Sequence, residues 1–346
     1  MEGKIIKAYK GFDKNMQCLG YQYEVGKEYD MDGEIKCCDR GFHACKSPLE
    51  VWDYYDMLSS RFAEVEQSGK IDKEGNSTKV CSSHIKIKAE LKLADIINIG
   101  VEWLKDITSP TKVKTTGTLN DNSGDYAQIG SSGYSAKIGS SGDYAQIGSS
   151  GYSAKIGSSG DYAKIGSSGY SAKIGLSGYS AKIGSSGDYA QIGSSGYSAK
   201  IGSSGYSAKI GSSGDYAQIG SSGYSAKIGL SGDYAQIGSS GDYAQIGSSG
   251  DYAQIGSSGD YAQIGSSGDY AKIDSTGEDS VIMCAGKRSK AKAKAGSWIT
   301  LSEWKWNDDK KRRVPVCVKT EFVDGNNIKA DTWYQLKNGE FVEVTE

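Results

Sequence analysis

Thiols and one imidazole gather near the start of the chain, where they could bind a metal ion. Cys37, Cys38, His43 and Cys45 fall within a short stretch, and thiolate and imidazole groups are common ligands of zinc. Structural zinc sites normally space paired cysteines two to four residues apart. Here two cysteines are adjacent, and a single residue separates the histidine from Cys45. We therefore expect small buried side chains at these positions and no metal.

An aspartate recurs through the middle of the chain beside glycine and serine, which raises the question of calcium. Nonapeptide repeats of the form G-G-x-G-x-D-x-U-x bind calcium in their turns, and each ion needs six or more oxygen ligands. Here the aspartate directly follows a glycine, a serine replaces one turn glycine, and seven of 17 units lack the acid. Repetitive calcium binding is therefore disfavoured.

The repeat that carries this aspartate is the strongest signal in the sequence. Isoleucine returns at every ninth position from Ile129 to Ile273, 17 times in all. A Gly-Ser-Ser-Gly segment, with Leu176 or Leu230 replacing one serine, alternates with Asp-Tyr-Ala-Gln/Lys-Ile or Tyr-Ser-Ala-Lys-Ile. Two glycines in nine residues exclude a helix. Collagen is excluded as well, because glycine does not fall at every third position.

Stacked coils of short strands are the structure that this pattern predicts. Five residues ending in Ala-x-Ile suit a strand with Ala and Ile on the inner face and Gln or Lys on the outer face. Gly-Ser-Ser-Gly suits a turn, and a stack can bury isoleucines that one unit cannot. We predict a parallel β-solenoid over residues 125–296 with two nine-residue units in each 18-residue coil. A 27-residue coil of three units stays the alternative, because the spacing of Leu176 and Leu230 fits a whole number of coils of either length.

The surface of this solenoid supplies candidate binding residues. Tyrosines at regular positions predict a stacked ladder, and their rings and hydroxyls could also bind sugar or a partner protein. Mixing the acidic and basic units avoids stacking like charges. The candidate binding residues are Tyr126, Tyr144, Lys200, Gln218 and Gln254.

An α+β domain is predicted for residues 1–110, followed by a join at 111–124. A helix is expected to begin at Ser47-Pro48, because Ser47 fits the capping position and proline the first helical position. The remaining predicted elements are strands at 5–9, 21–25, 62–66 and 84–93 and an amphipathic helix at 94–105.

A β-rich cap is predicted for residues 297–346. Asn338-Gly339 lies between alternating apolar residues and indicates a hairpin. The basic run at 287–294 suits a solvated edge of the solenoid better than a nucleic-acid patch. A cap of this kind would cover the last coil.

The composition excludes several functional classes. The chain has 40 basic and 42 acidic residues and a formal net charge of -2, so no overall field favours nucleic acid or anionic lipid. No apolar run is long enough for a transmembrane helix, and the first residues lack a secretory signal. We expect reduced cysteines.

The sequences AYKGFDKNMQCLGYQYEVGKEY, GFHACKSPLEVWDYY and RFAEVEQSGKI carry a resemblance to phage and prophage proteins. Such proteins often join an uncharacterised N-terminal domain to SGDYAQIGSSG-type repeats and to a tail like IKADTWYQLKNGEFVEV. The resemblance covers nearly the whole chain. It implies an origin in a phage or mobile element and, without a secretory signal, a location in the host cytoplasm or on a virion. It brings no known activity.

A second resemblance rests on Tyr9-Lys10-Gly11, on Gly41 to Cys45 and on Glu64-Val65-Glu66. These segments are similar to the Tyr-Arg-Gly strand, the Gly-Phe-x-Ser-Thr-Ser strand and the Glu-x-Glu pair of ADP-ribosyltransferases. The resemblance implies Lys10, His43, Glu64 and Glu66 as candidate catalytic residues and NAD as the cofactor. Lys10 lacks the planar fork of arginine, and no Ser-Thr-Ser is present, so a degenerate domain used for binding is also implied.

Two functions therefore remain. The first is a non-enzymatic binding or scaffold protein without a cofactor, whose solenoid is a spacer or multivalent platform for a host or phage protein and which could form a homo-oligomer. The second is an ADP-ribosyltransferase-like domain carried on a solenoid. An enzyme needs a concave pocket with converging polar groups, so the surface of the N-terminal domain distinguishes the two.

Overall fold

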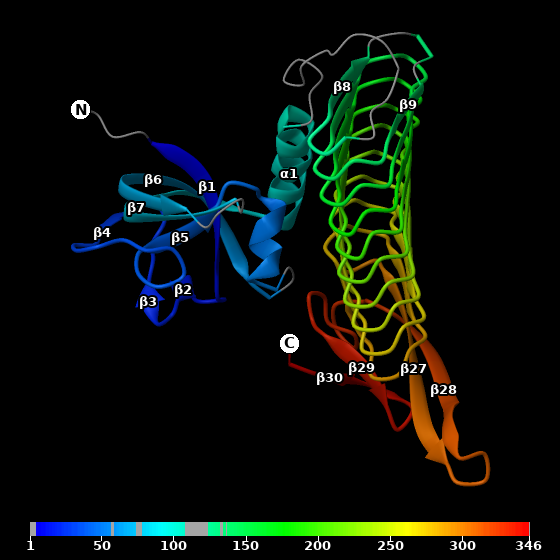
Figure 1. Ribbon diagram of the computed structural model, residues 1–346. Helices are drawn as coiled ribbons and strands as arrows, with labels where there is room; N and C mark the ends of the chain where they lie inside the picture. Colours follow the sequence, from blue (N-terminus) through cyan, green and yellow to red (C-terminus); the bar gives the residue numbers. More distant parts are fainter. Residues whose placement is uncertain are drawn as a thin grey trace. The chain divides into compact units, whose positions relative to one another are not determined.

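The computed structural model of the protein describes residues 5–56, 59–73, 78–107, 124–131, 134–135 and 137–345. The chain divides into two compact units, Met1–Trp103 and Leu104–Glu346. The first is a β-rich domain, and the second is a parallel β-solenoid that ends in antiparallel strands (Figure 1). The fold class expected from the sequence is confirmed. The join predicted at 111–124 lies outside the described residues, apart from Gly124.

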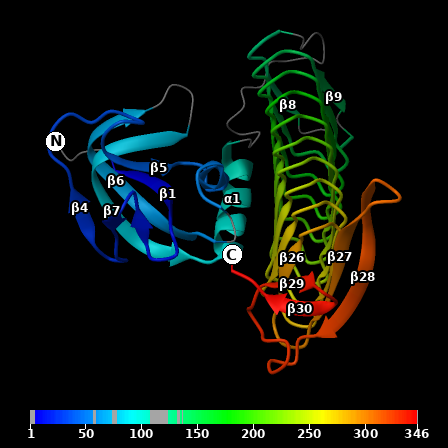
Figure 2. The same ribbon diagram turned by 90° about the horizontal axis from the view of Figure 1, so that it is seen from below.

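The N-terminal unit is a curled antiparallel sheet (Figure 2). Strand β1 pairs with β5 and β6, and β7 also pairs with both, so the four strands close a circuit. The elements are β1 (Ile6–Phe12), β2 (Gln17–Cys18), β3 (Tyr21–Gln22), β4 (Glu28–Asp30), β5 (Phe42–Cys45), the 3-10 helix η1 (Leu49–Asp53), β6 (Arg61–Lys73), β7 (Lys79–Leu91) and α1 (Leu93–Ile107). The amphipathic helix predicted at 94–105 is confirmed as α1.

Two local predictions for this unit are wrong. The helix expected after Ser47-Pro48 is only the short η1, and no side chain caps it. Its hydrogen bonds span three residues, as from Tyr54 N to Val51 O at 3.1 Å, so it is a tight 3-10 turn. The strand expected at 21–25 shrinks to two residues, because Tyr23 N turns aside and donates to Met16 O at 3.0 Å.

The solenoid consists of two parallel sheets, each built from every second nine-residue unit (Figure 1). Ile147 pairs with Ile165 in one sheet and Ile156 with Ile174 in the other, so each coil has two units and the 27-residue alternative is wrong. The 12-stranded sheet contains β8 (Gln128–Ser131), β10 (Gln146–Ser149), β12 (Lys164–Ser167), β14 (Lys182–Ser185), β16 (Lys200–Ser203), β18 (Gln218–Ser221), β20 (Gln236–Ser239), β22 (Gln254–Ser257), β24 (Lys272–Ser275), β26 (Lys290–Lys292), β29 (Tyr334–Lys337) and β30 (Glu340–Glu343). The 11-stranded sheet contains β9 (Lys137–Ser140), β11 (Lys155–Ser158), β13 (Lys173–Leu176), β15 (Gln191–Ser194), β17 (Lys209–Ser212), β19 (Lys227–Leu230), β21 (Gln245–Ser248), β23 (Gln263–Ser266), β25 (Val281–Cys284), β27 (Trp298–Asn307) and β28 (Arg312–Phe322).

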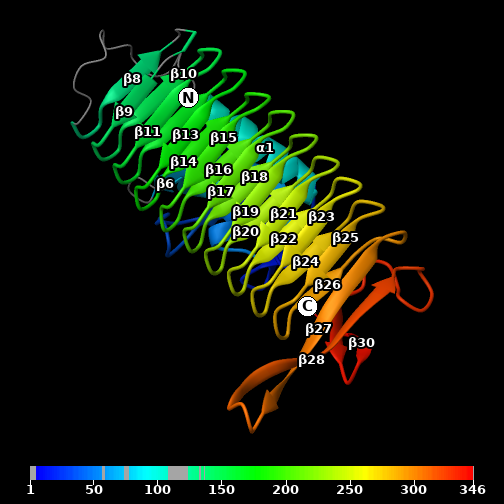
Figure 3. The same cartoon turned by 90° about the vertical axis from the view of Figure 1, so that its right-hand side faces the viewer.

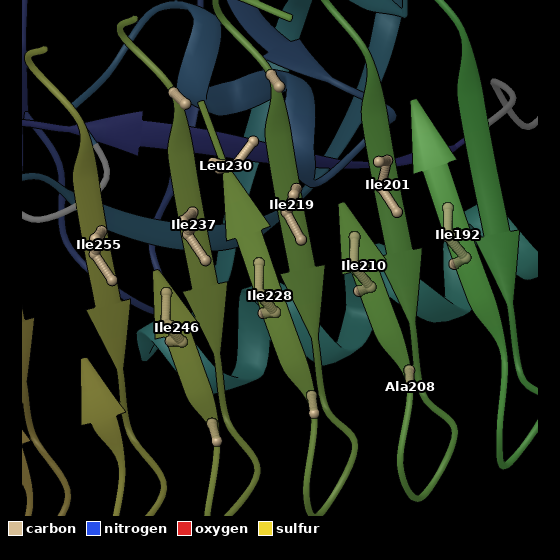
Figure 4. Packing of buried hydrophobic residues seen from close by; sticks show 14 of the residues in the cluster. Ile192, Ile201, Ala208, Ile210, Ile219, Ile228, Leu230, Ile237, Ile246 and Ile255 are labelled. Carbon is tan, nitrogen blue, oxygen red and sulfur yellow. The ribbon is translucent and has the colours of Figure 1, made fainter. Parts of the chain in front are cut away.

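Isoleucine fills the space between the two sheets. Ile201 and Ile219 of one sheet belong to the same buried cluster as Ile210 and Ile228 of the other (Figure 4). Alanines such as Ala208 are fully buried as well, so the inward facing predicted for Ala and Ile is confirmed. Burial of one isoleucine side chain contributes roughly 1.5–3 kcal/mol, and the ladder repeats this contribution in every half-coil.

The strands lie three residues later than the sequence pattern predicted. Strand β18 begins at Gln218 and continues through the glycine to Ser221, whose side chain is buried. The expected strand residue Tyr216 lies in a turn, because its φ of 56° is left-handed and cannot continue an extended strand. Glycine and serine at the predicted turn therefore extend the strand, and Asp-Tyr forms the turn.

Antiparallel strands end the stack of coils (Figure 3). Strand β27 pairs in parallel with β25 and antiparallel with β28, while β29 pairs antiparallel with both β26 and β30. The hairpin between β29 and β30 is the one predicted at Asn338-Gly339, where both residues have positive φ, 53° and 77°. These are the backbone angles that two-residue hairpins require.

The basic run before the cap is only partly solvated: Arg288 is exposed and the Lys294 side chain is 41% exposed, but the lysines of the run also have partners. Lys292 Nζ lies 2.9 Å from the carboxylate of Asp274, and Lys294 Nζ lies 2.7 Å from that of Asp331. The Trp333 ring lies 5.3 Å from Lys290 Nζ and 5.2 Å from Lys292 Nζ. Cap residues thus cover these lysines, which the sequence spacing alone could not show.

Tyrosine adopts two backbone conformations in the turns. In nine of the ten Asp-Tyr units its φ is 55° to 60°, a region that residues other than glycine rarely occupy. The tyrosine N–H of this left-handed turn donates to the following coil, as from Tyr252 N to Asp269 O at 2.8 Å. In Tyr-Ser units the direction reverses, and Ser225 N donates to Tyr206 O of the preceding coil at 2.9 Å.

Aspartate side chains support the left-handed turns. Asp233 Oδ1 accepts a hydrogen bond from Asp251 N at 2.7 Å, and Asp251 Oδ1 accepts one from Asp269 N at 2.7 Å. The carboxylate of each coil therefore binds a backbone N–H of the next coil. Hydrogen bonds to a charged acceptor are stronger than those between neutral groups, and here they offset the cost of the positive φ.

Neighbouring coils decide which turn forms. Tyr189 belongs to an Asp-Tyr unit, yet its φ is not positive, and its N–H donates to Tyr170 O at 3.0 Å as in a Tyr-Ser unit. The units one coil before and one coil after it are both of the Tyr-Ser form, at Tyr170 and Tyr206. Each left-handed tyrosine has another left-handed turn in at least one adjoining coil. The turn conformation is thus a nearest-neighbour property.

We expect Asp251→Ala to lower the free energy of unfolding by about 1–3 kcal/mol, because Asp269 N–H loses a charged acceptor. Asp188→Ala is the matched control, since the Asp188 carboxylate forms no hydrogen bond within the described part of the chain. Its effect should stay within about 0.5 kcal/mol. Urea unfolding followed by circular dichroism measures both variants, and equal losses would contradict the role of the aspartate.

Candidate functional site

The outer face of the 11-stranded sheet carries a shallow groove that runs along the coils. Its volume is about 1530 Å³, and each coil adds one long polar residue and one glycine to its lining. The polar row is Lys137, Lys155, Lys173, Gln191, Lys209, Lys227, Gln245 and Gln263, and the glycine row is Gly139, Gly157, Gly175, Gly193, Gly211, Gly229, Gly247 and Gly265. Val281 and Met283 line one end of the groove.

The fold does not require glycine in this row. A Cβ atom added to Gly193 would meet nothing within 4 Å, and Met283 occupies the same row one coil after Gly265. The turn glycine Gly196 is different, because a Cβ there would lie 2.0 Å from Gly178 O of the preceding coil. Glycine weakens a strand by roughly 0.5–1 kcal/mol relative to alanine. A strand glycine that the fold does not require often marks a place where a ligand approaches the backbone closely.

Five exposed lysines flank the glycine row. Lys137, Lys155 and Lys173 pair directly with one another across adjacent coils, and so do Lys209 and Lys227. The mixing of unit types therefore does not avoid the stacking of like charges, contrary to the prediction, and such stacking is unfavourable. No ion pair or hydrogen bond within the described residues neutralises these five side chains. The groove therefore presents a row of positive charge to solvent.

Two candidate residues on the other sheet are buried instead of exposed. Lys200 and Gln218 flank the inward Ile201 and Ile219 in their strands, but they are only 7% and 5% exposed. The equivalent Lys209 of the 11-stranded sheet is exposed. The expectation that every outward lysine and glutamine is solvent-exposed is therefore wrong. The same nine-residue unit therefore leaves its polar side chain exposed in one sheet and buried in the other.

The tyrosines form two stacked ladders, as predicted. The rings of Tyr126 and Tyr144 have centroids 5.0 Å apart and planes within 6°, and Tyr252 and Tyr270 are 4.8 Å apart with planes within 2°. Tyr126 is 69% exposed and Tyr144 is 37% exposed. Each ring thus covers its neighbour and keeps an edge in solvent. The remaining candidate binding residue, Gln254, is half-buried in the 12-stranded sheet.

The N-terminal unit contains a cavity of about 790 Å³. Strands β1 and β5 and the segments around η1 contribute its walls, which are rich in aromatic side chains. Its lining includes Lys10, Cys18, Phe42, His43, Cys45, Tyr9, Tyr21, Tyr23, Tyr54 and Tyr55. The ring of Tyr55 lies against Gly11, where a Cβ would come within 2.4 Å of it. This glycine therefore allows the aromatic wall to close over β1.

Lys10 is the unusual residue of this cavity, because it is only 4% exposed. Its ammonium group donates to His43 O at 2.9 Å and lies 3.4 Å from Cys18 Sγ, which is 2.9 Å from the Tyr55 hydroxyl. Burial lowers the pKa of Lys10, while the nearby Cys18 thiol acts in the opposite direction. Burial also raises the pKa of Tyr55 above its ordinary range, so this hydroxyl keeps its proton.

The four candidate catalytic residues do not come together. Lys10 and His43 both line the cavity, and Cys38 N donates to His43 Nε2 at 2.9 Å. Glu64 pairs across the sheet with Tyr9, whereas Lys10 pairs with Ala63, so Glu64 and Lys10 project from opposite faces. The Glu64 carboxylate instead lies 2.9 Å from Lys7 Nζ. Glu66 forms a separate ion pair with Lys88 at 3.0 Å.

The thiols show no metal-binding arrangement. Within the described ranges, no group of three or more His, Cys, Asp or Glu side chains could hold a metal ion. Cys81 is buried, and burial raises the pKa of its thiol to about 12. Cys284, inside the solenoid, behaves in the same way. Both thiols are therefore protonated at neutral pH and pack as small apolar side chains. Of the cysteines expected to be buried near the start of the chain, Cys45 is buried, but Cys37 is half-buried and Cys38 is exposed, so the expectation is wrong for the adjacent pair.

Fold and cavity together define a β-solenoid repeat protein with a separate N-terminal β-rich domain. Residues 6–99 of that domain match a family model described as a domain of unknown function (DUF7666). The match covers the cavity and stops before the repeats. No curated protein and no solved structure matches the chain. None of the described helices is long and apolar enough to span a membrane.

A pair of glycine substitutions distinguishes the glycine row that lines the groove from the glycines of the turns. We expect Gly193→Ala to raise the free energy of unfolding by about 0.5–1 kcal/mol, because the added methyl group meets open space and alanine restricts the unfolded chain. Gly196→Ala should lower it by more than that, because the carbonyl of Gly178 must move. Thermal and urea unfolding measure both changes. Destabilisation by Gly193→Ala would show that the fold requires glycine in the glycine row.

Proposed function

We propose that the protein is a non-enzymatic scaffold whose 11-stranded face binds an acidic surface of a partner protein along several coils. The observation that carries this proposal is the glycine row, which the fold does not require, beside a row of exposed lysines. The glycines have no side chains to cover the strand backbone in the groove, so a partner can contact that backbone. The lysines give that partner a charge to complement.

The repetition of the groove supports a multivalent mode of binding. Each coil offers the same small contact, so no single coil acts as the site, and affinity grows with the number of contacts engaged together. Partly exposed charges contribute little singly and are screened by salt. We therefore infer that binding is weak per coil, strong in sum and sensitive to ionic strength.

The likeness of the flanking and repeat sequences to phage and prophage proteins supports a host or phage protein as the partner. On this proposal, binding takes place in the host cytoplasm or on the virion. The transferase alternative stays a prediction, and the separation of Lys10 from Glu64 and Glu66 does not favour it.

Charge removal from the groove tests the proposal directly. A protein captured from host lysate by the full chain would be purified and titrated calorimetrically against a variant with Lys137, Lys155, Lys173, Lys209 and Lys227 changed to Gln. Gln already stands in this row at Gln191, so the variant should fold normally. We expect affinity to fall at least tenfold and to lose most of its salt dependence. The Lys310→Gln, Lys311→Gln variant is the control, and an unchanged Kd for the groove variant refutes the proposal.

Coil deletions test multivalency. Deletion of residues 202–219 removes two units, which make one full coil, and keeps every later strand in its own sheet, so the rod should fold and bind severalfold more weakly. Deletion of 202–210 removes a single unit and moves later strands to the opposite sheet, which should disrupt the pairing of β25 with β27 and of β26 with β29. Circular dichroism and the same titration measure both variants. A folded full-coil deletion that has lost all binding would place a unique site in the missing coil.

A further inference from the structure

The buried amine of Lys10 points to a second site, separate from the solenoid face. A lysine ammonium group is rarely buried without an acidic partner, because leaving water is costly. The polar contacts of Lys10 Nζ are a backbone carbonyl and a thiol, His43 O and Cys18 Sγ. Among the described residues, no carboxylate forms an ion pair with it. The rings of Phe12 and Tyr23 lie 5.6 Å from it.

The acidic side chains that line the cavity do not neutralise this amine. Asp13 Oδ1 accepts hydrogen bonds from two backbone N–H groups of its own loop, both at 2.8 Å. Asp56 Oδ1 accepts from the backbone N–H and the hydroxyl of Ser59, both at 3.0 Å, and Asp39 is exposed to solvent. The surroundings of Lys10 thus disfavour the charged form of the amine. A neutral amine has a free electron pair and can act as a nucleophile.

We propose that the cavity of the N-terminal unit takes a small aromatic aldehyde or ketone and that Lys10 captures it as an imine. The electron pair of Nζ forms a bond to the carbonyl carbon, and the carbonyl oxygen takes up a proton. Nζ loses a proton, and a second protonation releases the oxygen as water while the carbon–nitrogen double bond forms. No oxidant or reductant is needed, and hydrolysis reverses the step.

The cavity supplies what this chemistry requires. Its volume of about 790 Å³ admits a small molecule. Tyr21 and Tyr23, with ring centroids 5.0 Å apart, and Phe42 offer aromatic surface to a ring-bearing ligand. Tyr55 contributes a hydroxyl that stays protonated and is linked to Lys10 through Cys18. A hydrogen-bond donor and an amine therefore border the same space.

Reductive trapping tests the proposal on the full chain. The protein would be incubated with benzaldehyde and sodium cyanoborohydride at pH 7, and peptide mapping by mass spectrometry would follow benzylation of each lysine. Only about 0.04% of an ordinary lysine is neutral at that pH. We expect Lys10 to be labelled at least tenfold faster than the exposed Lys209 of the solenoid. Labelling of Lys10 no faster than Lys209 overturns the proposal.

Two further comparisons separate chemistry from a structural role. Lys10→Arg keeps a donor for His43 O but cannot form an imine, so benzylation of the cavity lysines should be confined to Lys79 while the fold, checked by circular dichroism, persists. With acetaldehyde as the probe, the preference for Lys10 over Lys209 should shrink severalfold. An equal preference for both aldehydes would overturn the aromatic class of ligand.

Discussion

Each coil of the solenoid is held to the next by parallel, in-register pairing of residues that occupy the same position in successive coils. This register places isoleucine on isoleucine in the interior and tyrosine on tyrosine in the turns. It also brings the turn backbones so close that Gly214 would clash with Gly196 O if it carried a side chain. Each position of the repeat therefore stacks on the same position of the next coil. The arrangement favours apolar and aromatic rows and disfavours charged ones, so the exposed lysine row is unfavourable for the stack itself.

The turns show how the stack accommodates two kinds of unit. An Asp-Tyr turn and a Tyr-Ser turn hydrogen-bond to opposite neighbours, so an isolated turn of one kind between two of the other would leave bonds unmade. Tyr189 resolves this conflict by adopting the conformation of its neighbours. The carboxylates of Asp233 and Asp251 favour the left-handed form where such units follow one another. Local sequence sets a preference here, and the adjoining coils decide the outcome.

The nine-residue period was enough to predict the solenoid, the inward isoleucines and alanines and the tyrosine ladders. The period could not place the strands, because Gly-Ser is compatible with a turn or a strand until the left-handed Tyr216 is known. It also could not show that Lys200 is buried while Lys209 is exposed, since both stand in identical units. In the N-terminal domain, Lys10 was identified from a short motif. Its burial depends on residues 18, 43 and 55, which only the closed sheet brings together.

The tyrosine ladders give the rod an optical property as well as a packing role. Rings whose centroids lie 4.8 to 5.0 Å apart and whose planes are nearly parallel couple their electronic transitions, so excitation absorbed by one ring can migrate to the next. The coupling is broken where a Tyr-Ser unit follows an Asp-Tyr unit: between Tyr162 and Tyr179 the centroids separate to 6.4 Å and the planes open to 51°. On one edge of the rod, Tyr216 to Tyr270 forms the longest unbroken run of the left-handed form. The mixture of units therefore divides an otherwise continuous chromophore into segments.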